Sequence, residues 1–340
     1  MTKAHASPQA PSRAVAAVAT EDDVYYAYRL LLGREPDAPG WEGHVSALAA
    51  KPVKPVDLAR HFMNSPEFEA RGAGVVTAKP DMPSIVEIPM DGFSIFVRSD
   101  DRDIGNHIRA LRSYEPHVTT VLRDLLRPGM TFVDVGANLG IFTNMAAKLV
   151  GPKGLVIAVE PLDKNLQLLY RALSHNGLEN VKVYACAAGE RIGLISILTD
   201  PGTSNGQPLP GVAADPRLFF TQTRRLDDLT DGVDRMDVVK FDIDGFELIA
   251  WRGFREQFAR FCPVVLTEFH PYGMEKFVKV DPLDYLAELF AYGAVHVLSQ
   301  DRGFPRIPCA SADAVMQHWK AVNGAGDGSV HVDLMITPKR

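Results

Sequence analysis

The sequence predicts an α/β fold with a mostly parallel, doubly wound sheet, preceded by a small all-α domain. From residue 131 onward, short apolar segments alternate with helical stretches, which is typical of parallel strands joined by crossover helices. Before residue 72, apolar residues recur at helical spacing and prolines separate the segments. We therefore expect four parts, which are a disordered tail at 1–20, a helical accessory domain at 21–72, a linker at 73–82 and an α/β domain at 83–340.

The composition is that of an ordinary globular protein, with 46% hydrophobic residues and a net charge of -6. No long basic block occurs, which argues against a nucleic-acid partner. The three cysteines (Cys186, Cys262 and Cys309) are far apart, so neither a disulfide framework nor a structural zinc site is indicated. No apolar run approaches the roughly 18 residues of a transmembrane segment. We expect a cytoplasmic protein, and the sequence leaves open whether it forms a homo-oligomer.

Three helices and the start of a fourth are expected in the N-terminal domain. Asp22 and Asp23 are suited to cap the first helix, Trp41 lies in the second, Val56–Met63 forms the third, and Asn64-Ser65-Pro66 signals a further helix start. The phrases LLGREPDAPGWEGHVSAL and FMNSPEF resemble a small helical module of bacterial surface and glycan-associated proteins, a domain of unknown function. This resemblance implies an accessory role and no chemistry of its own.

The α/β domain begins with a hairpin, because Ile85–Val97 alternates apolar and polar residues around Asp91-Gly92. Ile104–Leu126 predicts one or two helices, with a break at Tyr114-Glu115-Pro116.

The remaining elements follow in a regular rhythm. The predicted parallel strands are Thr131–Val135, Leu155–Glu160, Val181–Ala187, Asp237–Asp242 and Pro263–Glu268, and the predicted helices are Leu139–Val150, Leu162–His175 and Glu247–Phe261. Ala294–Ser299 and His331–Thr337, joined by a long loop, are expected to finish the sheet in antiparallel fashion. Leu198–Thr223 interrupts the rhythm with Gly, Pro, Ser and Asn, which predicts either a functional lid or a partly disordered excursion.

Four of the predicted strands end in or beside a carboxylate, at Asp134, Glu160, Asp242 and Glu268. The carboxyl ends of parallel strands meet at one edge of the sheet, so these acids are expected to lie near one another. Like charges repel there and are costly to desolvate. A ligand that is cationic or rich in hydroxyl groups should therefore bind among them.

The glycine turn after the first strand favours a ligand without phosphates. A dinucleotide site needs G-x-G-x-x-G, whereas this turn reads Asp134-x-Gly136-x-x-x-Gly140, and the acid before the first glycine would repel a pyrophosphate. Glu160, which ends the next strand, suits hydrogen bonding to a ribose. S-adenosylmethionine, with its ammonium, sulfonium and ribose, fits better than NAD(P). An NAD(P)-dependent oxidoreductase and a non-catalytic glycan-associated binding protein remain the alternatives.

Three separated motifs resemble the FkbM-type methyltransferases. They are TFVDVGANLGIFTNMAAKLVGPKGLVIAVEP, VKVYACAAGE and DVVKFDIDGFELIAWRGF, and the resemblance covers Tyr114–Pro271. It implies a class I Rossmann-like fold and S-adenosylmethionine-dependent O-methylation of a hydroxyl on a sugar, a glycan or a polyketide-like natural product.

The resemblance also assigns cofactor-binding positions. By position, it implies a cofactor turn formed by Asp134, Gly136, Asn138 and Gly140. Glu160 would hold the ribose, Ala187 would border the adenine, and Glu115 would face the methionine end of the cofactor. Pro161 is a further expected cofactor-binding residue. The family most often has Glu where this chain has Asp244, so any role of that position as a base or metal ligand stays open.

A hydroxyl acceptor needs its proton removed as it attacks, which calls for a positioned base. The candidates are Asp242, Glu268 and His270. Alternatively, Asp242, Asp244 and Glu268, with Glu247 nearby, could hold Mg²⁺. Purely structural roles are open as well, with His270 capping local backbone and the acids at 244 and 247 complementing a helix dipole. Lys240, inside a buried strand, is expected to pair with a strand-end acid.

Overall fold

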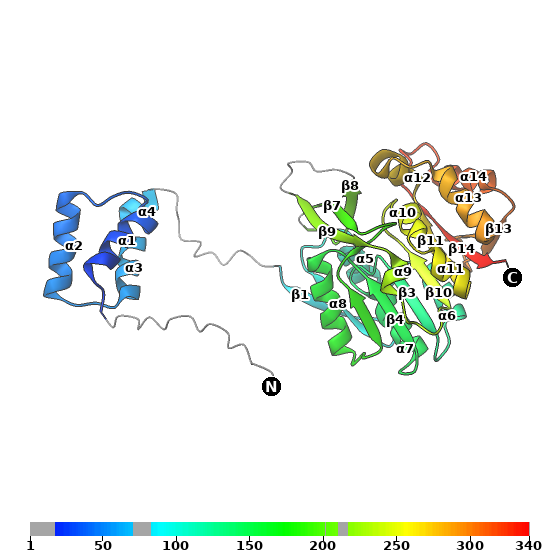
Figure 1. Cartoon of the computed structure of the whole chain (residues 1–340), viewed down its shortest axis with the longest axis horizontal. Helices are drawn as coiled ribbons and strands as arrows, with labels where there is room; N and C mark the ends of the chain where they lie inside the picture. The colour runs from blue at the N-terminus through cyan, green and yellow to red at the C-terminus, as the bar shows by residue number, and fades with distance from the viewer. Residues whose placement is uncertain (1–17, 71–82, 201, 210–216, 340) are drawn as a thin grey trace, which may run out of the picture. The chain divides into compact units, whose positions relative to one another are not determined.

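The computed structural model describes residues 18–70, 83–200, 202–209 and 217–339 (Figure 1). The chain divides into two compact units, Met1–Met82 and Pro83–Arg340. The predicted tail at 1–20 falls almost entirely outside the described residues, and the predicted linker at 73–82 does so completely. Within the described ranges, no helix is both long and apolar enough to cross a membrane.

The described part of the first unit, residues 18–70, consists of four helices, α1 (Glu21–Leu31), α2 (Ala38–Ala50), α3 (Pro55–Met63) and α4 (Pro66–Ala70). The N-cap of α1 is Thr20 rather than Asp22 or Asp23: its hydroxyl accepts a hydrogen bond from the backbone N–H of Asp23, whose carboxylate accepts one from the backbone N–H of Thr20. The small hydrophobic core of this first unit is formed by Val24, Ala27, Tyr28, Leu32, Leu58, Phe62 and Phe68.

The second unit is built on an eight-stranded sheet with the order β13-β12-β14-β11-β10-β3-β4-β5. The strands are β3 (Thr131–Val135), β4 (Leu155–Val159), β5 (Val181–Tyr184), β10 (Val238–Phe241), β11 (Val264–Phe269), β12 (Gly293–Leu298), β13 (Arg306–Cys309) and β14 (Val332–Pro338). Strands β5, β4, β3, β10 and β11 pair in parallel, and β14, β12 and β13 pair antiparallel. The predicted mostly parallel sheet with an antiparallel finish is confirmed. The predicted long loop before β14 is wrong, because it contains β13 and helix α14 (Ala312–Asn323).

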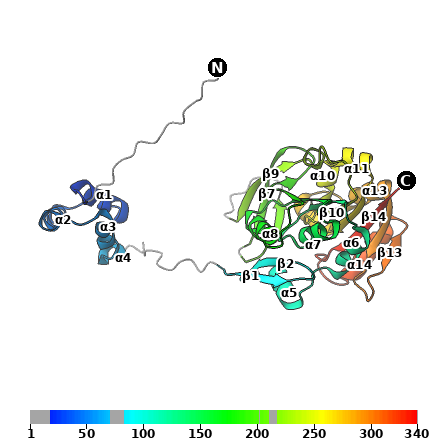
Figure 2. The same ribbon diagram turned by 90° about the horizontal axis from the view of Figure 1, so that it is seen from below.

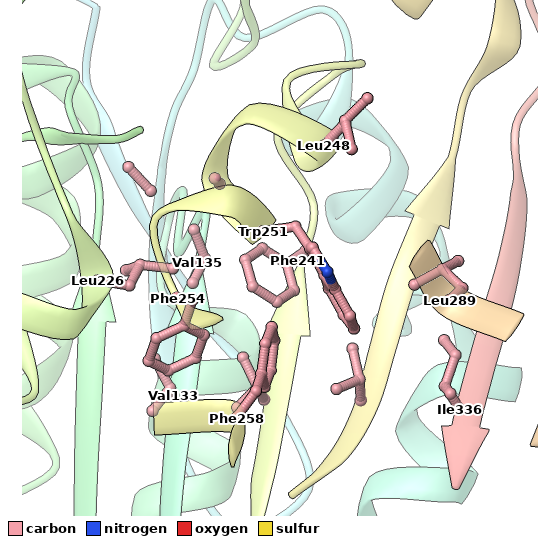
Figure 3. Packing of buried hydrophobic residues seen from close by; sticks show 14 of the residues in the cluster. Val133, Val135, Leu226, Phe241, Leu248, Trp251, Phe254, Phe258, Leu289 and Ile336 are labelled. Carbon is pink, nitrogen blue, oxygen red and sulfur yellow. The ribbon is translucent and has the colours of Figure 1, made fainter. Parts of the chain in front are cut away.

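Helices cover both faces of this sheet, as a doubly wound fold requires. On one face, Val133 and Val135 of β3 pack with a cluster from α9 (Leu226–Leu229), α10 (Glu247–Arg252), α11 (Arg255–Phe261) and α13 (Pro282–Tyr292). Figure 3 shows Phe241 of β10 with Trp251, Phe254 and Phe258 in this cluster. Phe132, on the opposite side of β3, packs with residues of α7 (Ile141–Val150) and α8 (Asp163–His175).

The elements before β3 form the predicted hairpin and two helices. Strands β1 (Ile85–Pro89) and β2 (Ser94–Arg98) pair antiparallel. Helices α5 (Ile104–Leu111) and α6 (Pro116–Leu125) are separated at Glu115, as predicted. Figure 2 shows α5 beside the hairpin, and Ile95, Ile104 and Ile108 share one apolar cluster.

A second sheet, with the order β6-β9-β7-β8, is inserted between β5 and β10. It consists of β6 (Ala187–Ala188), β7 (Gly193–Thr199), β8 (Gly206–Leu209) and β9 (Leu218–Arg224). The described parts of Leu198–Thr223 form strands, with β8 and β9 flanking β7 as antiparallel partners, and the functional lid predicted for this segment stays a prediction. The strand predicted at Val181–Ala187 is split between the two sheets.

Candidate active site

The turn after β3 packs directly on the turn after β10. Gly136 has φ +88°, and a Cβ at this position would lie 1.8 Å from the carbonyl oxygen of Asp242. Only glycine fits such a backbone conformation and such a close approach. Asn138, also left-handed with φ 50°, then places its backbone N–H 2.8 Å from Glu160 Oε2. Gly140 caps the start of α7.

Asp134 lies beneath this turn and lines neither cavity described below. Its Oδ2 accepts a hydrogen bond from Thr143 Oγ1 at 2.5 Å, and its Oδ1 has no hydrogen-bond partner among the described residues. Burial raises the pKa of Asp134, while the charge of Lys240, its cross-strand partner on β10, opposes that shift. The structure thus places this predicted cofactor residue under the turn rather than at its surface.

The first cavity lies at the carboxyl ends of β3 and β4 and over the second sheet. Among its lining residues are the predicted Gly136, Asn138, Glu160, Pro161 and Ala187. Its walls are largely apolar, being formed by Val135, Val159, Leu162, Cys186, Ile195, Ile197, Pro208 and Phe246.

Glu160 is held rigidly at the floor of the first cavity. It is 3% exposed; its Oε1 accepts hydrogen bonds from the Leu162 backbone N–H at 2.9 Å and from Asn165 Nδ2 at 3.1 Å, and its Oε2 accepts the bond from Asn138. Burial raises the pKa of Glu160 to about 7, although the hydrogen bonds oppose this shift.

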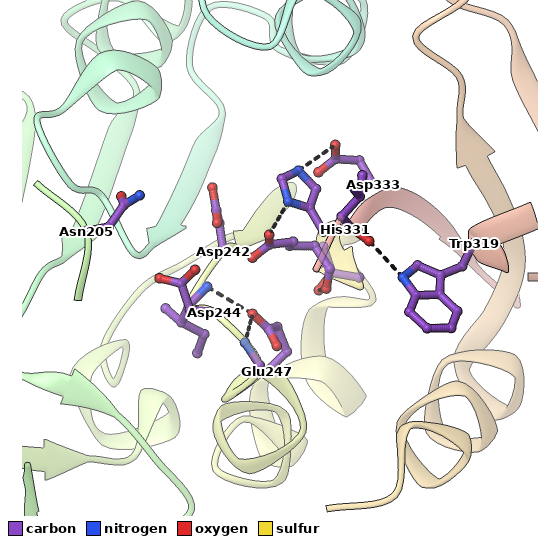
Figure 4. Close-up of polar contacts among 12 residues, drawn as sticks. Asn205, Asp242, Asp244, Glu247, Trp319, His331 and Asp333 are labelled. Atoms are coloured by element: carbon purple, nitrogen blue, oxygen red, sulfur yellow. Dashed lines mark hydrogen bonds and ion pairs between the residues drawn. The ribbon is translucent and has the colours of Figure 1, made fainter. Parts of the chain in front are cut away.

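The second cavity adjoins the first and collects the other predicted site residues. Glu115, Asp242, Asp244, Glu268 and His270 all line it. Four residues line both cavities, namely Gly136, Asn138, Asp242 and Asp244. In Figure 4, Asn205 lies on the other side of Asp242 from His331.

Asp242 is tied to a buried cation. Lys240 Nζ donates a hydrogen bond to Asp242 Oδ2, as was expected of a lysine within a buried strand. Burial alone would raise the pKa of Asp242, but the charge of Lys240 and this hydrogen bond hold it below its ordinary value. Asp242 is therefore a carboxylate at neutral pH.

Glu268 faces His331, a residue that the sequence did not single out. His331 Nδ1 lies 2.6 Å from Glu268 Oε1, and its Nε2 lies 3.9 Å from Asp333 Oδ2 (Figure 4). Attraction to Glu268 raises the pKa of His331 to about 11, so this imidazole is protonated and cannot accept a proton. On the far side of Asp333, His117 Nε2 approaches Oδ2 at 2.7 Å.

His270 follows β11 and points into the same group. It is 9% exposed, and neither ring nitrogen has a hydrogen-bond partner among the described residues. Ligand atoms of Asp244, Glu268 and His270 all lie within 4.8 Å of one another. Asp242 is not in this group, so the structure brings together Asp244, Glu268 and His270 rather than the three acids predicted to hold Mg²⁺.

Comparison with known proteins identifies the family of this chain. The methyltransferase FkbM domain matches residues 134–304, which is half of the chain and includes the glycine turn, Glu160 and His270. The chain belongs to the FkbM methyltransferase family.

Other similarities of this FkbM-family chain are shorter or more distant. It is 34% identical over 70 residues to protein-L-isoaspartate O-methyltransferase 1 of Archaeoglobus fulgidus, which is 20% of this chain and 32% of that protein. It is 56% identical over 41 residues to ribosomal RNA large subunit methyltransferase E of Acinetobacter baumannii, 12% of this chain and 19% of that protein. The matches thus span a third or less of these relatives. A crystal structure of methyltransferase FkbM from Methylobacillus flagellatus has a TM-score of 0.38 at 19% identity, covering 69% of this chain and 60% of that one.

Two further acids of this FkbM-family chain, Glu115 and Glu247, lie at or beside the second cavity in different environments. Glu115 has φ 39°, its buried Oε2 lacks a hydrogen-bond partner among the described residues, and burial raises its pKa to about 8. Glu247 Oε1 accepts hydrogen bonds from the backbone N–H groups of Ile243 and Gly245, so it closes the turn before α10 and stays out of both cavities. The structural role that was left open for Glu247 describes it well.

Proposed function

We propose that this protein is an S-adenosylmethionine-dependent O-methyltransferase that acts on a hydroxyl of a sugar, a glycan or a polyketide-like natural product. One observation carries the proposal. Two cavities meet at Gly136, Asn138, Asp242 and Asp244. The first is lined by a buried acid, Glu160, that suits a ribose, and the second is lined by carboxylates and imidazoles. A two-substrate transfer needs such an arrangement, because both reactants must be held next to each other.

The first cavity suits the donor. A carboxylate offers about four acceptor sites, and Glu160 uses two on Oε1 and one on Oε2, so Oε2 keeps one site for a ribose hydroxyl. The apolar walls from Ile195, Ile197 and Pro208 suit a flat purine. When bound, S-adenosylmethionine supplies an electrophilic methyl group. Asp242, where the cavities meet, is better placed than Asp134 to face its ammonium group.

The second cavity suits a neutral, hydroxylated acceptor. Glu115, Asp242, Asp244 and Glu268 line it, and their carboxyl groups can form hydrogen bonds with hydroxyl groups. His270 has free ring nitrogens that can take a hydroxyl proton, and such a base is typically worth about 10²–10⁴-fold in rate. His331 is already protonated and serves instead to balance the charge of Glu268. Asp242 and Glu268 remain alternative bases.

Calorimetric titration of the full chain with S-adenosylhomocysteine tests the donor assignment. We expect one site per chain, and we expect Glu160→Ala to weaken binding about 100-fold or more because it removes a charge-assisted hydrogen bond of roughly 1.5–3 kcal/mol and the support of the Asn138 turn. Glu179→Ala, an exposed acid before β5, is the matched control and should bind like the wild type.

Absence of binding by the wild-type chain would refute the proposal, and a spectral response to NAD(P)H would then favour the oxidoreductase alternative. Transfer of a labelled methyl group to a panel of sugar, glycolipid and polyketide acceptors, with S-adenosylmethionine as donor, would identify the second substrate.

A further inference from the structure

The group formed by Asp244, Glu268 and His270 combines two carboxylates with an imidazole on one wall of the second cavity. Their ligand atoms lie within 4.8 Å of one another, so small side-chain movements would bring them to one ion. Asp244 comes from the turn after β10, and Glu268 and His270 come from the end of β11. Because β10 and β11 are parallel neighbours, the sheet itself holds these ligands together.

Buried atoms without hydrogen-bond partners point into this group. His270 is 9% exposed and Glu268 is 5% exposed. Both ring nitrogens of His270 and Oε2 of Glu268 have no hydrogen-bond partner among the described residues. A buried polar atom left this way costs free energy comparable to a lost hydrogen bond. An ion would provide the missing partner for each residue at once.

The local charge also calls for a cation. Asp242 is compensated by Lys240, and Glu268 Oε1 by His331. Asp244 has no such partner: its side chain has no hydrogen bond or ion pair in the described part of the chain.

We propose that Asp244, Glu268 and His270 form a binding site for a divalent transition-metal ion, Mn²⁺ or Zn²⁺ in type, with its open positions facing the second cavity. An imidazole ligand favours such ions over Mg²⁺, which prefers oxygen ligands and several waters. A hydroxyl bound at an open position would lose its proton more easily, and with His270 held as a ligand the proton would pass to Asp242, the alternative base outside this group. Only this last role rests on the proposed methyl transfer; the binding site itself does not.

Binding is tested with the full chain, freed of metal by chelation and titrated with Mn²⁺, while electron paramagnetic resonance measures the free ion. We expect one Mn²⁺ per chain and displacement by Zn²⁺. Asp244→Asn and His270→Gln should each weaken Mn²⁺ binding by about tenfold or more. Glu275→Gln, an exposed acid on the segment after β11, should bind Mn²⁺ like the wild type.

Absence of Mn²⁺ binding by the wild type, or unchanged binding by both site variants, would overturn the site. Displacement of Mn²⁺ by an equal concentration of Mg²⁺ would contradict the assignment of the His270 imidazole as a metal ligand. If His270→Gln fails to fold, Asp244→Asn decides, because Asp244 is only partly buried. S-adenosylhomocysteine binding by the metal-free chain separates the two proposals: if it persists without Mn²⁺ binding, the metal site alone fails.

Discussion

Glu160, which lines the first cavity, makes the free energy of unfolding depend on pH. Its pKa of about 7 in the folded chain exceeds the ordinary value of 4.5, so the folded state holds this proton more tightly than the unfolded chain does. The resulting stabilisation is complete below about pH 4.5 and is lost as the pH rises through about 7. A shift of this size corresponds to a change in the free energy of unfolding on the order of 3 kcal/mol.

We therefore expect the free energy of unfolding of the wild type to fall more steeply between about pH 4.5 and 7 than that of Glu160→Gln, which cannot titrate. Urea unfolding at several pH values measures both profiles. Glu115 and Glu247, whose pKa values burial also raises, contribute equally to both proteins and cancel in the comparison. Parallel profiles would show that Glu160 keeps an ordinary pKa.

Single residues were predictable where their position in a parallel strand decides their place. Glu160, Asp242 and Glu268 end strands, so the parallel order brings them to one edge of the sheet. His331 escaped prediction because it reaches Glu268 only through the antiparallel register of β11 with β14, where Glu268 pairs with Asp333. Nothing in a single sequence fixes the register of strands so far apart along the chain.

At the scale of elements, α10 and α11 are fixed to the sheet by aromatic rings that pack at tilted and edge-on angles. The centroid of the Phe254 ring lies 4.7 Å from that of Phe258 and 6.2 Å from that of Phe241, and the Phe254 side chain is fully buried. The turn that carries Asp242 and Asp244 lies between β10 and α10, so this packing also holds one wall of the site.

Phe254→Ala should lower the free energy of unfolding by about 3–5 kcal/mol, because it leaves a cavity among these rings. Denaturant unfolding followed by circular dichroism measures this. Phe220→Ala, at a β9 ring that is 50% exposed, should change stability by less than about 1 kcal/mol. Equal losses in the two variants would contradict the role given to the aromatic cluster.

Elements were predictable from the sequence where periodicity is strong, as in β3, α7, β4 and α8. The second sheet was not. Gly206–Leu209 contains glycine and proline, and Leu218–Arg224 ends in polar residues, so neither shows a clear strand pattern. Both become strands by pairing with β7, which the sequence does not reveal. Helix α14 was missed for a different reason, because Ala312, Val315, Met316 and Trp319 do recur at helical spacing and pack on the core cluster of the sheet, so its pattern was available in the sequence.

At the scale of the whole molecule, the two compact units have separate hydrophobic cores. The helical unit relies on a small cluster around Tyr28 and Phe62, and cores of this size are marginal. Both cavities are lined entirely by residues of the second unit.

A protein comprising residues 83–340 should therefore keep the thermal transition of the α/β unit and bind S-adenosylhomocysteine as the full chain does. Calorimetric scans of both proteins test this, and the full chain should show an additional transition from the helical unit. A large loss of donor affinity in the shorter protein would mean that the first unit contributes to the site.

The residues shared by the two cavities restrict how this enzyme family could diversify. Under the proposed function, replacing Gly136, Asn138 or Asp242 would disturb both reactants at once, so substitutions at these three positions are expected to abolish methyl transfer whatever the acceptor. Residues such as Ile104, Asn205 and Ser329 line the second cavity but not the first, so replacing them leaves the first cavity unchanged. Under the proposed function, substitutions at these positions could change which acceptor binds while the donor site stays the same.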